Sequence, residues 1–407
     1  MGAVKPEEEA ASEAATEQAC YSCASENKKH ERDMAVGAEE DVGEDDNREL
    51  IPGLPDDVAM ECLARVPSRS HRRMRRVCRG WRGAVVSAEF RRRRRTAGAA
   101  EDVVFLVQAA PAGGSGGDGK CSAPACALVA ANLTTGEWRR VEAVPLFAQC
   151  ASAGDGRHVA VVGGWDPDTL RPTRDVRVLD VPAGAWRRGR PMPGDARSFF
   201  GCAGGGNGEV YVAGGHDGSK NALRSALAYG VAADAWRALP DMAEERDEPQ
   251  LVAVPGGRGG AVLLAASGYP TEAQGAFKNT AECYGGGDAW TTEGDVDVVP
   301  AGTCLASVRG NVWAVGPGKG GVRERVDGAW RDVADGPPGM KACVKAVGVG
   351  EGDGAAVFVF GTVADAAAEG GRHAAWVMDD AATAAWRRVP VPPGFDGFVY
   401  SAAAVRV

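Results

Sequence analysis

Histidines and cysteines are the residues of this 407-residue chain that could hold a metal or act in catalysis. His158, His216 and His373 are far apart in the main body of the sequence, and no two histidines have the spacing of paired metal ligands. Cys20 and Cys23 form a single CxxC, without the second pair that a zinc site needs. No GxSxG, Walker or HExxH motif occurs. The sequence therefore predicts a protein that is not an enzyme and that binds no metal or other cofactor.

The clearest pattern is a repeated unit that ends in tryptophan. In the copy Glu209–Leu239, a short apolar run ends in Gly214-Gly215, and a polar loop leads to two further strands that carry Tyr229 and Trp236. Equivalent tryptophans recur at intervals of 48, 50, 54, 40 and 56 residues. They are Trp138, Trp186, Trp236, Trp290, Trp330 and Trp386. A period of about 50 residues with four short strands per unit is typical of kelch-type propeller blades.

We therefore predict an all-β propeller over residues 101–407. It has six blades, although the 40-residue interval leaves five possible. The first blade contains only three strands, at 103–108, 127–132 and 137–141, and a C-terminal strand at 398–405 is expected to complete it and close the ring. The inner strands of the later blades are expected at 147–153, 197–203, 250–254, 302–308 and 342–348.

Composition restricts the class of protein further. The 57 glycines have no Gly-X-Y period, which favours turn-rich β-structure over collagen. No apolar run has the length of about 18–20 residues that a membrane span requires. The sequence begins without a secretory signal, and its eleven cysteines follow no disulfide framework. We therefore expect reduced thiols and a location in the cytoplasm and nucleus.

The N-terminal segment differs in character from the rest. Residues 1–49 contain 15 acidic and 5 basic side chains. Such a charged segment with almost no aromatic residues is predicted to be disordered, and we assign residues 1–48 to an acidic tail.

Helical patterns appear next, within residues 49–95. Pro55 and two aspartates favour the start of a helix, and apolar residues follow it at helical spacing from Val58 to Val66. A second apolar stripe runs from Met74 to Val85, where Gly80 and Gly83 weaken the helix or split it in two. About 45 residues cannot bury both stripes among themselves, so these stripes are expected to face a partner in part. Packing against the propeller is the alternative.

These residues resemble a known family. Leu54-Pro55-Asp56-Asp57, Cys62-Leu63 and Val77-Cys78-Arg79-Gly80-Trp81-Arg82 look like an F-box. Together with blade motifs such as Ala213-Gly214-Gly215-His216-Asp217 and Glu245-Arg246-Asp247-Glu248, they make the chain similar to plant F-box/kelch-repeat proteins of the KISS ME DEADLY type. The arginine-rich second F-box helix and the missing double glycine in the last two blades depart from that pattern.

The resemblance implies a substrate receptor of an SCF-type ubiquitin ligase. Its F-box, residues 49–95, would bind a Skp-family adaptor and through it a cullin–RING ligase. The implied adaptor-binding residues are Leu54, Pro55, Val58, Cys62, Leu63, Val66, Val77 and Trp81. The implied targets are phenylalanine ammonia-lyase or type-B response regulators of cytokinin signalling. The alternative is a kelch scaffold that acts without a ligase, for example as a nuclear cofactor.

In kelch receptors, as the resemblance implies, the substrate protein meets the loops at one face of the propeller. Here those loops carry mixed charges, which suit the recognition of a protein surface. The predicted substrate-binding residues are Arg197, His216, Lys220, Asn221, Glu245, Arg246, Glu248, Glu272 and Gln274. Any one of these side chains could instead cap a turn or tie adjacent loops together.

A run of arginines lies between the two modules. Residues 65–95 contain 13 arginines and one acid, Glu89, and end in five consecutive arginines at 91–95. No interleaved aromatic residues, helix-turn-helix pattern or zinc spacing accompanies the run, so nucleic acid is not the expected partner. We interpret it as a solvated helix end, with a nuclear-import signal as the alternative.

Overall fold

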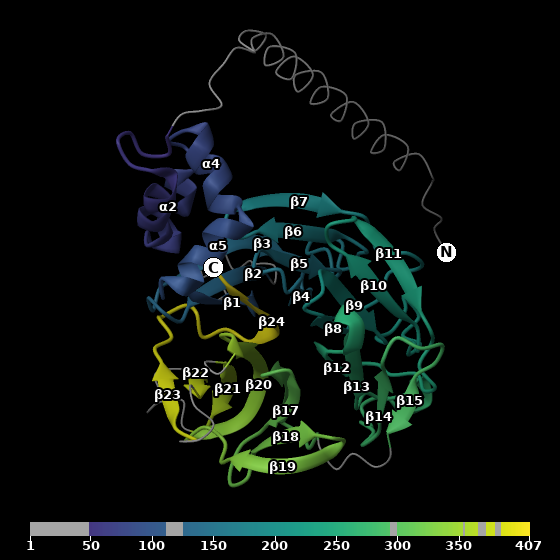
Figure 1. Ribbon diagram of the computed structural model, residues 1–407. Coiled ribbons are helices and arrows are strands. Elements are labelled where there is room, and N and C mark those ends of the chain that lie inside the picture. The colour runs from purple at the N-terminus through teal and green to yellow at the C-terminus, as the bar shows by residue number, and fades with distance from the viewer. Residues whose placement is uncertain (1–48, 111–124, 294–298, 353–354, 365–371, 379–383) are drawn as a thin grey trace, which may run out of the picture. The chain divides into compact units, whose positions relative to one another are not determined.

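The computed structural model describes residues 49–110, 125–293, 299–352, 355–364, 372–378 and 384–407. The predicted acidic tail, its CxxC pair and the glycine-rich loop of the first blade lie outside these residues. Residues Gly53–Val407 form one compact unit, in which short helices precede a propeller of six four-stranded sheets (Figure 1). Among the helices of the described residues, none is long and apolar enough to span a bilayer.

The six blades confirm the predicted fold and exclude five blades. In each sheet the strands follow one another from the inside outwards as a, b, c and d, with antiparallel pairing throughout. Blades 2 and 3 comprise β4 (Gln149–Ser152), β5 (His158–Val162), β6 (Val176–Asp180), β7 (Ala185–Gly189), β8 (Gly201–Gly204), β9 (Glu209–Ala213), β10 (Ala226–Gly230) and β11 (Ala235–Leu239). Blade 4 comprises β12 (Gln250–Pro255), β13 (Ala261–Ala266), β14 (Ala281–Tyr284) and β15 (Thr291–Glu293). Blades 5 and 6 comprise β16 (Cys304–Val308), β17 (Asn311–Val315), β18 (Val322–Val326), β19 (Ala329–Ala334), β20 (Met340–Val349), β21 (Ala356–Val363), β22 (His373–Met378) and β23 (Trp386–Val389).

The first blade is closed by the end of the chain, as predicted. Its strands are β24 (Val399–Arg406), β1 (Asp102–Ala109), β2 (Cys126–Asn132) and β3 (Trp138–Val144). The inner strand β24 pairs with β1 from Asp102 opposite Arg406 to Gln108 opposite Val399. The last strand of the chain therefore joins the first, which removes two unpaired sheet edges.

Three of the repeated tryptophans form a hydrogen bond to the preceding blade. The indole Nε1–H of Trp236 donates to the carbonyl of Arg190 at 2.8 Å, and Trp290 and Trp386 make the same bond to Pro240 and Asp335. Each acceptor is the first residue after strand d of the preceding blade. The regular tryptophan spacing in the sequence thus reflects a hydrogen bond that recurs between neighbouring sheets.

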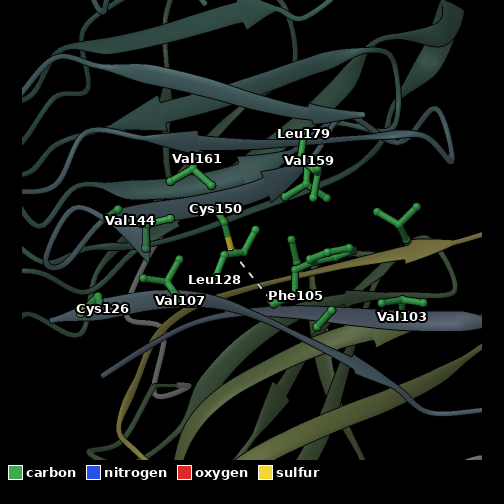
Figure 2. Packing of buried hydrophobic residues seen from close by; sticks show 14 of the residues in the cluster. Val103, Phe105, Val107, Cys126, Leu128, Val144, Cys150, Val159, Val161 and Leu179 are labelled. Carbon is green, nitrogen blue, oxygen red and sulfur yellow. Dashed lines mark hydrogen bonds between the residues drawn. The ribbon is translucent and has the colours of Figure 1, made fainter. Parts of the chain in front are cut away.

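The hydrophobic core lies between adjacent blades. Between blades 1 and 2, Phe105 and Leu128 pack with Cys150 and Val161, and all four side chains are buried (Figure 2). Burial raises the pKa of the Cys150 thiol to about 12, so this cysteine behaves as a small apolar residue. Alternating strand residues from two sheets supply each such layer, which fixes the angle between the blades.

The helices are α2 (Asp56–Ala64), α3 (His71–Met74), α4 (Arg79–Val86) and α5 (Ala88–Thr96), with the 3₁₀ turn η1 at Ser68–Ser70. The second predicted helix is divided, but not at its glycines. It breaks between Met74 and Arg79, where the Cys78 thiol caps α4 by accepting a hydrogen bond from the backbone N–H of Trp81 at 3.4 Å. Gly80 and Gly83 lie inside α4, so the cap decides where this helix begins.

A buried ion pair joins the helices to the propeller. Arg94 of α5 is 1% exposed, and its guanidinium donates to the carbonyls of Ala64, Val66 and Ala99 and to the carboxylate of Glu101. The prediction of a solvated helix end is therefore wrong at Arg94, because the carbonyls at the end of α2 need a donor.

Glu101 extends this connection into the first blade. Its carboxylate accepts hydrogen bonds from the backbone N–H and hydroxyl of Ser68 at 2.8 and 2.6 Å, and from the Asn132 amide at 2.6 Å. Its backbone pairs with Val407 in both directions. Burial alone would raise the pKa of Glu101, but these hydrogen bonds and the charge of Arg94 outweigh burial and lower it. The carboxylate is therefore charged at neutral pH.

His71 packs beside this ion pair as a neutral residue. Its ring meets Phe90 edge-on at 5.3 Å, and its Nε2 lies 3.3 Å from the Val66 carbonyl oxygen. Burial, followed by the charge of Arg94, lowers the pKa of His71 to about 4. At neutral pH Arg94 therefore has no second buried cation beside it.

We predict that Arg94→Met lowers the free energy of unfolding by about 3 kcal/mol, because it leaves Glu101 charged and buried without its cation. Arg95→Met is the matched control, since Arg95 is exposed and pairs with the exposed Glu351. This control should cost less than about 1 kcal/mol. Urea unfolding followed by circular dichroism compares the two variants, and equal costs would contradict the importance given to the buried pair.

Candidate functional site

The propeller has two distinct faces. Strand a begins and strand b ends on the same side of each sheet, so the b–c loops and the d–a connections share one face, here called the loop face. The helices attach to the opposite face, where Arg75 donates to the Ala183 carbonyl in the c–d turn of blade 2 at 2.6 Å. Arg95 meets Glu351 in the a–b turn of blade 6 on that same side.

On the helices, the predicted adaptor-binding residues divide by exposure. Val58 and Val77 are 43% and 60% exposed, and Pro55 and Cys62 are also exposed. Leu54, Val66 and Trp81 are half-buried. Leu63 is buried, so it supports the helices from within and offers no contact area in this state. The helices therefore bury Leu63, Met74, Val85 and Phe90 and leave other apolar side chains accessible.

On the loop face, two predicted substrate-binding residues prove to be internal. Arg197 is buried and donates to the carbonyls of Gly214 and Ser225, the two ends of the b–c loop of blade 3. Arg246 is fully buried and makes the same contacts one blade later, to Ser267 and Thr280. Their assignment to the substrate-facing surface is corrected, because each guanidinium is occupied in holding the loop of its own blade.

Two more predicted residues, His216 and Glu245, contact polar groups of neighbouring loops. The Nδ1 of His216, a residue that is 8% exposed, lies 2.8 Å from the Asp247 carboxylate of the next blade. Glu245 accepts hydrogen bonds from the backbone N–H and hydroxyl of Thr271. Among the described residues, no three His, Cys, Asp or Glu side chains gather as a metal site would require.

The other predicted residues of the loop face are exposed. Glu248 accepts a hydrogen bond from the Tyr269 hydroxyl at 3.1 Å. Burial and the nearby charges of Asp247 and Glu248 raise the pKa of Tyr269, so its hydroxyl stays protonated. The remaining exposed residues are Lys220, Asn221, Glu272 and Gln274. These five side chains are spread over the loops of blades 3 and 4 and form no single cluster with the buried arginines.

A group of aromatic residues that the sequence analysis missed lies on the loop face. Phe147 is central: its ring centroid lies 5.6 Å from Trp165, 5.3 Å from Phe199 and 5.0 Å from Tyr400. Phe398 continues the series at 5.0 Å from Tyr400 and is 45% exposed. We call these five residues, which come from blades 1 to 3, the aromatic arc. The signal in the sequence was that Phe147 and Phe199 occupy equivalent positions of successive blades.

Two residues of the aromatic arc, Phe147 and Phe199, have a left-handed backbone conformation. Phe147, Phe199 and Glu248 each lie two residues before strand a of their blade, and their φ angles are 57°, 52° and 53°. Gly302 takes this position in blade 5 with a φ of 81°. A left-handed phenylalanine costs about 1–2 kcal/mol, and such strain concentrates at functional sites. The same left-handed turn therefore precedes strand a in four blades, where it presents phenylalanine twice, glutamate once and glycine once.

The exposed apolar side chains identify the same two surfaces. Among the described residues, five large apolar side chains are exposed, and they are Val58, Val77, Leu170, Phe277 and Phe398. The first two belong to the F-box module, Val58 on α2 and Val77 between α3 and α4. The other three belong to b–c loops or a d–a connection of the loop face. Exposed apolar residues that gather at particular places are typical of protein-binding surfaces.

Comparison with known proteins agrees with this division. Residues 51–93 match the F-box domain, and residues 197–243 match the kelch motif. The chain is 40% identical to F-box/kelch-repeat protein SKIP20 of Arabidopsis thaliana over 64% of this chain and 71% of that protein. F-box/kelch-repeat protein At2g44130 of the same plant is 41% identical over 64% of this chain and 70% of its own length. The chain belongs to the plant F-box/kelch-repeat proteins.

An F-box with kelch repeats suggests the substrate receptor of an SCF-type ubiquitin ligase. Proteins of this family are generally non-catalytic adaptors. The F-box implies binding to a Skp1-type adaptor, and the kelch propeller implies binding to a substrate protein. In this F-box/kelch-repeat protein the two modules meet at the Arg94–Glu101 pair, on the face opposite the aromatic arc.

We predict that at position 199 glycine is more stable than alanine. Phe199→Gly removes the left-handed strain that Phe199→Ala keeps, so its free energy of unfolding should be higher by about 1 kcal/mol. Phe200, which is buried and has no positive φ, is the control. There the order should reverse, because glycine costs more backbone entropy than alanine. Denaturant unfolding of the four variants measures both differences, and the same order at both positions would contradict the strain.

Proposed function

We propose that the chain is the substrate-recognition subunit of an SCF-type E3 ubiquitin ligase and has no catalytic residues of its own. The observation that supports this most is the distribution of exposed apolar side chains, which fall on the F-box helices and on the loop face and nowhere else among the described residues. The F-box would bind the adaptor, and the loop face would bind the substrate protein. Ubiquitin transfer then follows from proximity, because a bound lysine meets the charged conjugating enzyme at a high effective concentration.

We propose two classes of substrate protein, phenylalanine ammonia-lyase and the type-B response regulators. This proposal rests on the likeness of the F-box and blade motifs to receptors of the KISS ME DEADLY type. We also propose that the protein acts in the cytoplasm and nucleus, because the eight cysteines of the described residues form no disulfide, as is usual in a reducing compartment. Fractionation of plant cells tests that location.

The competing function is a kelch scaffold that binds proteins without joining a ligase. It requires the apolar F-box surface to have some other partner. The two functions differ in one property that can be measured directly, which is binding to a purified Skp-family adaptor.

We predict that Val58→Asp combined with Val77→Asp weakens adaptor binding at least tenfold, because two exposed apolar contacts would be replaced by charges that lose hydration at the interface. Leu170→Asp is the matched control, since Leu170 is equally exposed but lies on the loop face. It should bind the adaptor as wild type does. Titration of each variant with the purified adaptor measures the effect. If wild type fails to bind, or if the double variant binds equally well, the scaffold function is favoured.

A further inference from the structure

A basic hollow lies beside the aromatic arc. It has a volume of about 690 Å³ and opens on the loop face over blades 5, 6 and 1. Its lining includes Gly302, Lys341, Thr362, Arg372, His373 and Phe398. Of these residues, only Phe398 belongs to the aromatic arc, and the F-box is on the opposite face of the propeller.

Among the described residues, the lining of the hollow carries two cations and no carboxylate. Lys341 and Arg372 are exposed, and neither forms an ion pair with a carboxylate of the described residues. The chain as a whole has a formal net charge of −9, so a concave place whose described lining has two cations and no carboxylate differs in sign from the average surface.

More positive charge lies along the adjoining inner strand. Lys345 is half-buried on β20 and has no ion pair with a carboxylate of the described residues. On the inner strand β4 of blade 2, the charge of Lys345 opposes the effect of burial on the pKa of Cys150. The hollow and the inner strand below it therefore share one sign of charge.

An aromatic wall forms one side of the hollow. His373 lies 6.0 Å from Phe398, stacks on Phe360 at 5.6 Å, and has its Nδ1 2.8 Å from the Asp396 carbonyl oxygen. From Phe398 the aromatic arc continues to Tyr400 and Phe147 in two steps of 5.0 Å. An extended peptide covers such a distance in about three residues. One ligand can therefore reach the cations and the arc at the same time.

We propose that the basic hollow binds the carboxylate side chain of an acidic, extended segment of the substrate protein, while an apolar side chain a few residues away packs on the aromatic arc. The cations supply charge-assisted hydrogen bonds to the carboxylate, and the arc supplies apolar area around it. This inference rests on the proposed receptor function and specifies the chemistry of its substrate. Lys341 and Arg372 are then specificity-determining residues.

The test selects ligands from a random-peptide phage library on the full chain. We expect peptides that combine Asp or Glu with an aromatic or aliphatic residue. Lys341→Gln with Arg372→Gln should abolish the acidic preference. Arg171→Gln with Lys319→Gln should keep it, because this control removes the same charge from exposed loop-face positions outside the hollow. Three results would each overturn the proposal. The selected peptides could lack acidic residues, the library could yield no peptide at all, or acidic peptides could still bind the Lys341/Arg372 double variant.

Synthetic versions of a selected peptide identify the anion. Replacing its Glu by Gln should weaken binding to wild type about tenfold, the effect of losing one charged contact, and should change binding to the Lys341/Arg372 double variant little. A phosphoserine peptide that binds tenfold more tightly than the Glu peptide would overturn the carboxylate in favour of phosphate. Adaptor binding is measured separately on the same preparations, so a failed receptor function and a failed hollow give different results.

Discussion

The structure depends on one buried contact, between Arg94 and Glu101. A guanidinium has five N–H donors in a fixed plane, so a single side chain can satisfy carbonyls at the end of α2, a carbonyl after α5 and a carboxylate at the start of the propeller. Glu101 in turn bonds the η1 turn, the end of β2 and the last residue of the chain. A buried ion pair adds little net stability over an apolar contact, but it defines one geometry, because either charge alone is costly to bury.

That geometry sets the relation between the two binding surfaces. Arg75 and Arg95 add contacts to blades 2 and 6 on either side of the pair, so the helices are held at three points. The F-box and the loop face thus lie on opposite sides of one compact unit. In a ligase the distance from the adaptor to the substrate decides which lysines can be reached, and a rigid receptor keeps that distance constant. At Phe147 and Phe199 the surrounding blades likewise hold the backbone in a left-handed conformation that phenylalanine disfavours.

The sequence predicted those features that local patterns encode. The tryptophan spacing predicted six blades because each copy carries a tryptophan on strand d or directly before it, and at Trp236, Trp290 and Trp386 the indole bonds to the preceding blade. The apolar C-terminal run predicted the closing strand. The burial of Arg94, Arg197 and Arg246 could not be predicted, because their partners are carbonyls and carboxylates that only the folded chain brings together. The basic hollow was missed for the same reason: Lys341 and Arg372 are separated by a β-hairpin in the sequence. The helix break at Cys78 was misplaced because a thiol cap outweighed two glycines.

The most direct test of this account is the distance between the two modules in solution. Spin labels carried by unnatural amino acids at Arg76 on the F-box and Lys220 on the loop face, both exposed, allow the distance distribution to be measured by double electron–electron resonance. The account predicts one narrow distribution for the otherwise wild-type protein and for Arg95→Gln, and a broad one for Arg94→Gln. A broad distribution without either substitution, or a narrow one that Arg94→Gln leaves unchanged, would contradict the claim that the buried pair fixes the F-box on the propeller.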